Sequence, residues 1–536
     1  MQISVISLII VKLSTPEIDK TMRTLSFTET NPQFGAAILS AKLKWLLVAT
    51  LSAILFLLAT QQANAVPLFA RQTGQNCLAC HAGGQYPELT PYGRYFKLTG
   101  YTQGTRQDIP IAVSFVGGMA SSPSGNIAPS APNQSNSFAG NSQQNGKFEP
   151  DNASVYVGGK IFDNFGAFSQ WTYAFDSQST NGGVNNQNTF GADNQDWRYA
   201  DHYVGDSSST VNDIIWGASL NNAPSVTDVW NSAPSWMYPY MPSSRNGGTS
   251  GVPVNALLGA NGGLRAPGYG GYIYLNKNFY AELEAYQSGG SGPLSWMTYG
   301  STNSNSIPNG IPNNAPTYLK GLNPYFRLAY QSDEHGPHNW MIGALGMNVA
   351  QYGPNANGLA PGSPDLSGGV TQYQDRGVDA QYQYLSNPHT VTVQARYMRE
   401  NITDNNNIVY GNSTNNLNSI TLKASYVYDA KYGVGLGYQN VSGSADGVYG
   451  TASYIGTGAA TCLTCLPNSN SNGSQIGSPN STAWVPSIWW QALQNVRLGL
   501  QYTAFTQYMG ASKNYDGQGT NASANNTTWL YLWMAM

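Results

Sequence analysis

Short runs in which apolar and polar residues alternate recur along most of the chain after residue 107. In residues 391–397, for example, the odd positions are Val, Val, Ala and Tyr, and the even positions are Thr, Gln and Arg. Residues 279–286, 420–426 and 496–503 show the same pattern, with their charged residues confined to one face. A period of two predicts β-strands with one apolar and one polar face.

These runs predict about sixteen strands, if each has the roughly 9–11 residues that cross an outer membrane. The connections between the runs alternate in length: those at 163–166, 276–278 and 386–388 are short, and those at 122–152 and 221–268 are long. Outer-membrane barrels have short periplasmic turns and long extracellular loops, so this alternation favours a barrel. The predicted strands start near Ile111, Ala153, Ala167, Trp197, Asp213, Tyr269, Phe279, Pro324, Asn339, Thr371, His389, Leu417, Tyr432, Val485, Val496 and Thr527.

The last eight residues, 529–536, read Trp-Leu-Tyr-Leu-Trp-Met-Ala-Met and form an apolar strand at the C-terminus. This strand resembles the C-terminal assembly signal of bacterial outer-membrane proteins, except that Met536 stands where an aromatic residue is usual. We expect it to pair with the first strand and to close an antiparallel all-β barrel over residues 107–536.

Composition supports a membrane barrel and excludes one class of partner. Charged residues make up 10% of the chain, against roughly 25% in ordinary soluble domains, while aromatic residues reach 12%. The net charge of −3 argues against binding to nucleic acid. A secreted β-sandwich or propeller also fits this composition, but neither requires connections that alternate in length.

An export signal begins late in the chain. Lys42 and Lys44 precede the apolar residues 45–59, and Ala63-Asn64-Ala65 follows as a small-residue cleavage site. We therefore expect a cleaved signal peptide at 42–65, with residues 1–41 as an upstream extension from a misassigned start codon.

Directly after this signal the chain reads Cys77-Leu78-Ala79-Cys80-His81. Two thiols at this spacing can add to both vinyl groups of a haem, and the adjacent imidazole can then ligate the iron. The alternatives are a disulfide or half of a zinc site, but no second Cys/His pair at zinc spacing lies nearby. The motif predicts one covalent haem c, held by residues 66–106 inside the barrel lumen, with His81 as the proximal ligand.

Other residues are candidates for contacts with this haem. Arg71, Arg94 and Lys97 either bind the haem propionates or position the segment through salt bridges to the barrel. The second axial ligand is open, and His202 and Met119 are the candidates.

A second cysteine pair, Cys462 and Cys465, lies in a long polar connection. Leu466 stands where a second haem would need a histidine, so a haem is not expected there. In an oxidising compartment a disulfide within this loop is the preferred interpretation, with a redox or metal role as the alternative.

Two segments carry a family resemblance. Residues 69–81 read Phe-Ala-Arg-Gln-Thr-Gly-Gln-Asn-Cys-Leu-Ala-Cys-His, and residues 87–101 read Pro-Glu-Leu-Thr-Pro-Tyr-Gly-Arg-Tyr-Phe-Lys-Leu-Thr-Gly-Tyr. Together they resemble the haem segment of outer-membrane monohaem cytochrome–porin fusions, and residues 217–222, 228–231 and 234–236 look like the broader family. The resemblance implies a single c-type haem domain fused to a barrel, and the best-known members oxidise ferrous iron outside the cell.

The predicted function is electron transfer across the outer membrane, from extracellular Fe(II) to a periplasmic carrier such as a soluble cytochrome. A hydrocarbon core about 30 Å thick separates such partners, and a haem inside a barrel of about sixteen strands bridges it. The alternatives are a solute-conducting porin with a haem-bearing plug and a soluble secreted haem protein. The chain shows no nucleophile–base constellation, phosphate loop or paired acid/base carboxylates.

Overall fold

The computed structural model describes residues 68–84, 88–123, 146–175, 189–206, 209–232, 252–259, 264–289, 293–298, 318–353, 366–405, 409–450 and 473–536. The expected extension and signal peptide, together with Cys462 and Cys465, lie outside the described residues. Within the described ranges, no helix has both the length and the apolar character needed to cross a membrane.

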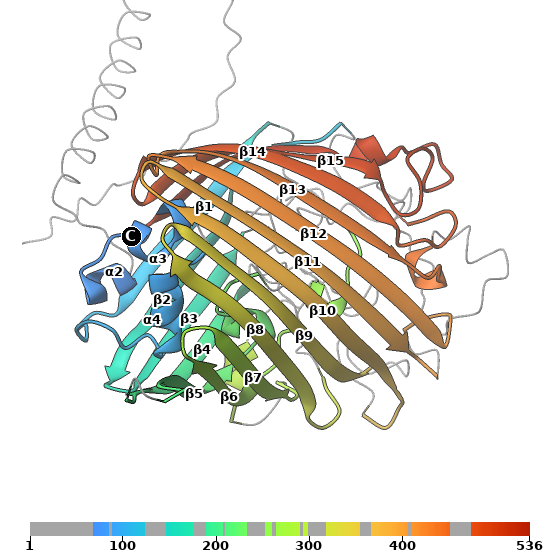
Figure 1. Ribbon diagram of the computed structural model, residues 1–536. Coiled ribbons are helices and arrows are strands. Elements are labelled where there is room, and N and C mark those ends of the chain that lie inside the picture. Colours follow the sequence, from blue (N-terminus) through green and yellow to red (C-terminus); the bar gives the residue numbers. More distant parts are fainter. Residues whose placement is uncertain are drawn as a thin grey trace, which may run out of the picture. The chain divides into compact units, whose positions relative to one another are not determined.

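Sixteen antiparallel strands form one closed barrel, in which each strand pairs with its neighbours in sequence (Figure 1). The predicted closure is confirmed, since the last strand pairs with the first and Gly118 lies opposite Tyr531. The strands are β1 Ile111–Ser121, β2 Phe148–Phe162, β3 Phe165–Ala174, β4 Thr189–Val204, β5 Asp213–Asn221, β6 Gly268–Leu275, β7 Phe279–Tyr286, β8 Asn323–His335, β9 His338–Tyr352, β10 Val370–Leu385, β11 His389–Thr403, β12 Thr414–Tyr428, β13 Tyr432–Gly443, β14 Ser481–Leu493, β15 Val496–Gln507 and β16 Thr527–Ala535.

The predicted starts at Ile111, Phe279 and His389 coincide with the observed ones, and the short and long connections alternate as expected. The start of β4 is wrong, because the strand begins at Thr189 and not near Trp197. The added residues pair with β3 across an irregularity in register between Ser169 and Trp171. An extra residue in one strand breaks the period of two, and the polar stretch before Trp197 therefore did not read as a strand.

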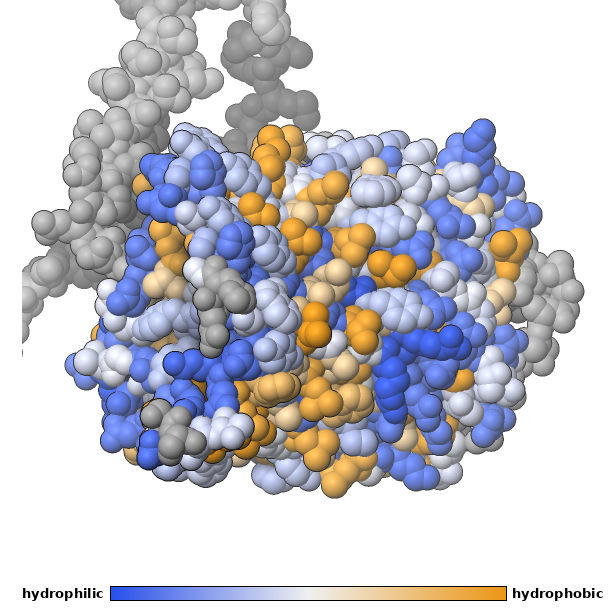
Figure 2. All heavy atoms as spheres, in the orientation of Figure 1, coloured by the Kyte–Doolittle hydropathy of each residue, from blue (hydrophilic) through white to orange (hydrophobic). Residues whose placement is uncertain are grey.

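Side chains on the barrel wall follow the predicted division between the faces. On β11, Val393 and Tyr397 are exposed on the outside, whereas Gln394 and Arg396 are buried inside. Figure 2 shows apolar residues gathered in a band across the middle of the visible face, with hydrophilic residues toward both sides. A closed ring of strands with an apolar belt suits a lipid bilayer and excludes the soluble secreted protein. The chain is therefore a bacterial outer-membrane barrel.

A helical segment, residues 68–84 and 88–106, precedes the barrel. It contains α2 Leu68–Thr73, α3 Cys77–Cys80, η1 Ala82–Gly84 and α4 Pro91–Leu98. Arg94 on α4 donates hydrogen bonds to Gln383 and Asp333 at 3.0 Å each, and Glu88 forms an ion pair with Lys423. These partners belong to different strands, and Gln383 and Asp333 are close to short turns. The helical segment therefore lies inside the lumen, at the end of the barrel that carries the short turns.

Part of the connection between β5 and β6 also folds into the lumen, contrary to the expectation that the long connections face outward. This inner loop, residues 222–232 and 252–259, includes α5 Pro224–Thr227 and η3 Leu257–Gly259. Asp228 forms an ion pair with Arg327 at 3.1 Å, and the guanidinium of Arg396 donates a hydrogen bond to the carbonyl of Ser232 at 3.2 Å. The sequence signals for this inward fold are two groups of apolar residues in the connection, one around Trp230 and one at residues 252–258.

Shorter helical turns complete the described elements and lie in other long connections. They are η4 Ser295–Thr298, η5 Gly447–Tyr449 and η6 Ala522–Asn525. The site described below depends only on the helical segment, the inner loop and the wall formed by β1, β2, β3 and β16.

Candidate functional site

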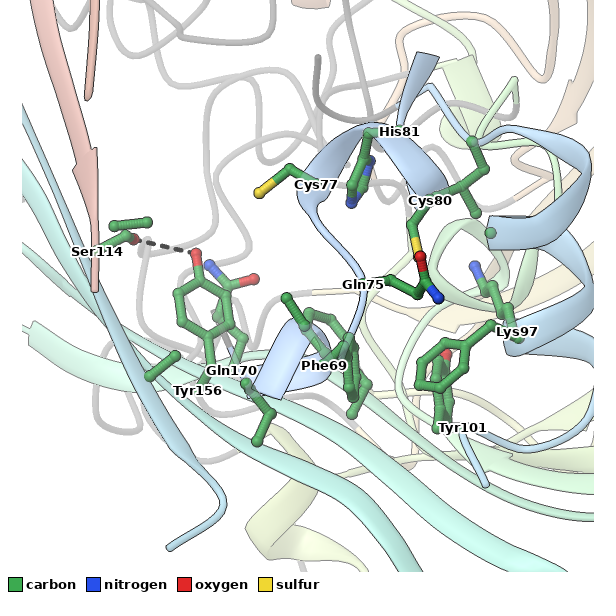
Figure 3. Close-up of a pocket in the computed structure, with 18 of the residues that line it drawn as sticks. Phe69, Gln75, Cys77, Cys80, His81, Lys97, Tyr101, Ser114, Tyr156 and Gln170 are labelled. Atoms are coloured by element: carbon green, nitrogen blue, oxygen red, sulfur yellow. Dashed lines mark hydrogen bonds between the residues drawn. The ribbon is translucent and has the colours of Figure 1, made fainter. Parts of the chain in front are cut away.

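A cavity lies between the helical segment and the barrel wall, with about 1260 Å³ of space, part of it open to solvent. Cys77, Cys80 and His81 line it from the helical segment. In Figure 3 the imidazole of His81 lies between the two cysteines, and Phe69 and Tyr156 are on the opposite side of the view. Much of the remaining lining is apolar or aromatic, including Leu68, Leu89, Phe96, Phe168, Val226 and Trp533.

A single helical turn brings the three motif residues to one wall. The side chain of Asn76 caps α3 and accepts a hydrogen bond from the backbone N–H of Ala79 at 3.2 Å. The N–H of His81 then donates to the carbonyl of Cys77 at 2.8 Å, which closes the turn. Asn is a favoured N-cap residue, so the residue before the motif helps to fix its geometry.

Helix α4 packs directly against this turn. Thr90 caps α4 by accepting from the N–H of Gly93 at 3.1 Å, and its own N–H donates to the carbonyl of Cys80 at 2.9 Å. Gly93 leaves no room for a side chain, because a Cβ there would lie 2.2 Å from the carbonyl oxygen of Cys80. Sequence reasoning missed Thr90 and Gly93 as site residues, although Thr90-Pro91 is a recognisable helix start.

Replacing Gly93 with alanine should separate α4 from the turn that carries Cys77, Cys80 and His81. Overpacking of this kind costs about 1–3 kcal/mol, so the helical segment should become more sensitive to trypsin while the barrel stays resistant. Gly447→Ala is the matched control, because a Cβ at Gly447 meets nothing within 4 Å. Equal trypsin sensitivity of the two variants would show that the close contact at Gly93 is unimportant.

His81 is suited to bind a metal. Burial lowers the pKa of the imidazole to about 4, while a hydrogen bond to the backbone of Glu88 and the charge of its carboxylate act in the opposite direction. The ring is therefore neutral at neutral pH, as a metal ligand must be.

Neither motif cysteine forms a disulfide. Burial, together with the charge of Cys77, raises the pKa of the Cys80 thiol to about 11. Within the described ranges, no group of three or more His, Cys, Asp or Glu residues is placed to hold a metal ion.

The cavity has the residues that a c-type haem needs. Two thiols and a neutral imidazole share one wall, and the surrounding walls are largely apolar. Lys97 supplies a cation at the polar side, where its ammonium donates to the carbonyl of Asp228 at 2.6 Å. Burial lowers the pKa of Lys97 to about 8. A planar apolar group that carries a carboxylate therefore fits the apolar walls and the buried cation of Lys97.

The predicted basic contacts divide into two kinds. Lys97 lines the cavity, but Arg71 and Arg94 do not. Arg71 donates to the carbonyl of Ile111 at the start of β1, and Arg94 forms a 3.0 Å ion pair with Asp333. The two arginines thus connect the helical segment to the barrel, which is the alternative that the sequence left open.

Neither candidate for the second axial ligand lies at the cavity. Met119 is on the outer side of β1, opposite Leu530, whose side chain is 43% exposed. The Nε2 atom of His202 lies 2.9 Å from a carboxylate oxygen of Asp213, and its Nδ1 atom lies 3.4 Å from the hydroxyl of Tyr95. Among the described lining residues, His81 is the only histidine and no methionine occurs. The sequence could not distinguish these positions, because their orientation depends on strand register.

The separate variants Met119→Leu and His202→Ala should therefore leave the absorption spectrum of the purified protein unchanged. Each removes a side chain that does not line the cavity. The measurement is the visible spectrum of the oxidised and reduced forms. A shifted Soret band in either variant would identify that residue as a ligand and contradict the geometry.

The aromatic row on the last strand faces the lumen. Trp529 and Tyr531 stack with ring centroids 4.6 Å apart, and Trp533 lines the cavity. The ring of Tyr531 lies over Gly499, where a Cβ would be 2.2 Å from it. Aromatic rings laid over glycines stabilise strand pairs, so this row packs the seam of the barrel.

No family model matches the chain, and no curated protein matches its sequence. Among the solved structures with a similar fold is OmpF of Salmonella typhi, solved with daunomycin, at 12% identity and TM-score 0.41, covering 80% of this chain and 97% of that chain. The outer membrane channel DcaP of Acinetobacter baumannii matches at 12% identity and TM-score 0.39, covering 80% and 96%. The anion-selective porin of Comamonas acidovorans matches at 10% identity and TM-score 0.38, covering 80% and 98%.

The strand pairing and the apolar exterior of this chain define its class. It is a porin-like outer-membrane β-barrel with sixteen antiparallel strands.

Proposed function

We propose that the protein carries one covalent haem c and transfers electrons across the outer membrane, from extracellular Fe(II) to a periplasmic carrier. The observation that carries this proposal is the placement of Cys77, Cys80 and His81 on one wall of a largely apolar cavity inside the barrel. The resemblance of residues 69–81 and 87–101 to cytochrome–porin fusions supports the same assignment.

Each residue of the site has a proposed role. Cys77 and Cys80 hold the haem through thioethers, and His81 ligates the iron. Lys97 donates hydrogen bonds to a propionate, while Phe168 and Trp533 exclude water. When bound, the haem supplies one-electron transfer.

The position of the cavity suits the direction of transfer. The cavity lies near the short turns, which face the periplasm in outer-membrane barrels. A periplasmic carrier can therefore approach the haem closely. Electrons from outside must first cross the part of the lumen between the long loops and the cavity, where the inner loop lies.

Anaerobic addition of Fe(II) to the purified oxidised protein tests the donor. The expected result is the absorption spectrum of reduced haem, at a rate that rises with Fe(II) concentration. If haem is present but Fe(II) never reduces it, the donor assignment fails. If a different small donor then reduces the haem, the proposed role in electron transfer still holds and only the identity of the donor changes.

A solute-conducting porin with a haem-bearing plug is the second candidate, and the closed barrel favours it. Against it, the inner loop inside the lumen is bound both to the wall and to the helical segment. Asp228 forms a fully buried ion pair with Arg327 of β8, and its carbonyl accepts a hydrogen bond from Lys97 of α4. We expect low conductance in a planar bilayer. A large conductance that is the same with oxidised and reduced haem would support the porin.

A further inference from the structure

Charged side chains of the barrel wall lie close to the His81 side of the cavity. Glu88 forms an ion pair with Lys423 of β12, and both side chains are 5% exposed. The carbonyl of Glu88 accepts a hydrogen bond from the N–H of Ala82, the residue after His81. This ion pair is therefore next to the motif and contributes one negative and one positive charge.

Arg497 adds a second positive charge from β15. It lies opposite Trp533 of β16 and is 4% exposed. Its guanidinium carbon is 5.7 Å from the centre of the Trp533 ring and 6.0 Å from that of Trp489. Trp533 lines the cavity, so this cation packs against a residue of the cavity wall.

The direct hydrogen-bond partners of Arg497 are neutral, although its charge also acts on the carboxylate of Glu88. Its Nε donates to the side-chain oxygen of Gln491 at 3.1 Å, and the phenol of Tyr531 is a further hydrogen-bond partner. In the part of the chain that the structure describes, no carboxylate lies within 4 Å of its side-chain nitrogens. The balance beside His81 is two positive charges against one negative charge.

The charge of Arg497 lies next to the cavity in a buried region. Arg497 and Trp533, the cavity residue on which it packs, are each 4% exposed. Charges act more strongly across a buried, low-dielectric region than across water. A fixed positive charge at this place therefore influences any charge held at the cavity.

We propose that Arg497 raises the reduction potential of the haem iron, as a positioning residue that acts through the surroundings of His81. The inference rests on the proposed function, because it requires haem in the cavity. Reduction of a bound ferric haem would add one electron to the iron, taken from Fe(II), which would be oxidised to Fe(III). A nearby positive charge stabilises the product of that step. The surrounding charge and dielectric are among the means by which a protein sets a haem potential. A raised potential suits a haem that accepts electrons from Fe(II).

The test is a redox titration of the purified, haem-loaded protein. Arg497→Gln should lower the midpoint potential by about 59 mV, which for one electron corresponds to a tenfold change in the reduction equilibrium. Arg497→Lys keeps the charge, so its midpoint potential should be close to that of the unmodified protein. Lys431→Gln is the control, because Lys431 is an exposed cation on a short turn and is paired with Asp429.

A second variant should change the midpoint potential in the opposite direction. Glu88→Gln removes the one negative charge of the cluster and should raise the midpoint potential. An unchanged potential in Arg497→Gln, or a decrease in both variants, would overturn the proposal. If Arg497→Gln fails to assemble, Arg497→Met takes its place as the neutral variant, and it should lower the midpoint potential in the same way. Absence of covalent haem in the unmodified protein would instead refute the proposed function.

Discussion

A double variant with Cys77→Ala and Cys80→Ala is expected to insert as a folded barrel that contains no covalent haem. Both thioether positions are lost, and the cavity offers no other thiol among its described lining residues. The barrel should still form, because its strands satisfy their backbone hydrogen bonds in a closed ring. Haem staining of a denaturing gel measures attachment, and a heat-dependent shift in mobility measures folding.

The matched control changes the second pair, Cys462→Ala with Cys465→Ala. This pair lacks a following histidine, so the control should retain the haem. Haem that stays attached without Cys77 and Cys80 would refute the assignment of the motif. A barrel that fails to insert without them would show that the helical segment and the barrel fold as one unit. The predicted boundary at residue 106 would then be wrong.

His81→Ala is expected to keep the covalent haem and to lose electron transfer. The thioethers remain, but the iron loses the ligand that sets its potential. The rate of reduction by Fe(II) should fall by about 100-fold or more, since even loss of a partner that only orients a metal ligand costs about 10–100-fold. Stopped-flow absorbance gives this rate, and the visible spectrum reports the change in ligation.

His338→Ala is the control for this variant. His338 also lies at a short turn, where its ring contacts the hydroxyl of Tyr382 at 2.8 Å, and it does not line the cavity. It should leave both the spectrum and the rate unchanged. A His81→Ala protein with the spectrum and rate of the unmodified protein would show that another residue ligates the iron.

The barrel could be predicted because lipid imposes a simple rule on its wall. Residues 391–397 alternate so clearly since one face meets lipid and the other meets the polar lumen. The rule weakens beyond the membrane, and residues 189–196 of β4 were therefore missed. The inner loop was missed for a different reason. Its place depends on distant partners, such as Arg327 with Asp228, that no local pattern reveals.

The motif residues of the candidate site could be predicted because their spacing is local. Cys77, Cys80 and His81 lie on one turn of chain, and the structure brings them to one cavity. The rest of the site is assembled from strands far apart in sequence. Trp533 and Arg497 reach it through the pairing of β15 with β16. The outward direction of Met119 likewise follows from register, where a shift of one residue reverses every side chain.

The most direct test of the account is electron transfer into sealed vesicles. Proteoliposomes would enclose an oxidised soluble cytochrome together with a small dye, and Fe(II) would be added outside. The account predicts that the enclosed cytochrome is reduced without release of the dye, and that the variant lacking Cys77 and Cys80 shows neither. Reduction at the same rate in that variant, or release of the dye together with reduction, would contradict transfer through a haem held in the barrel.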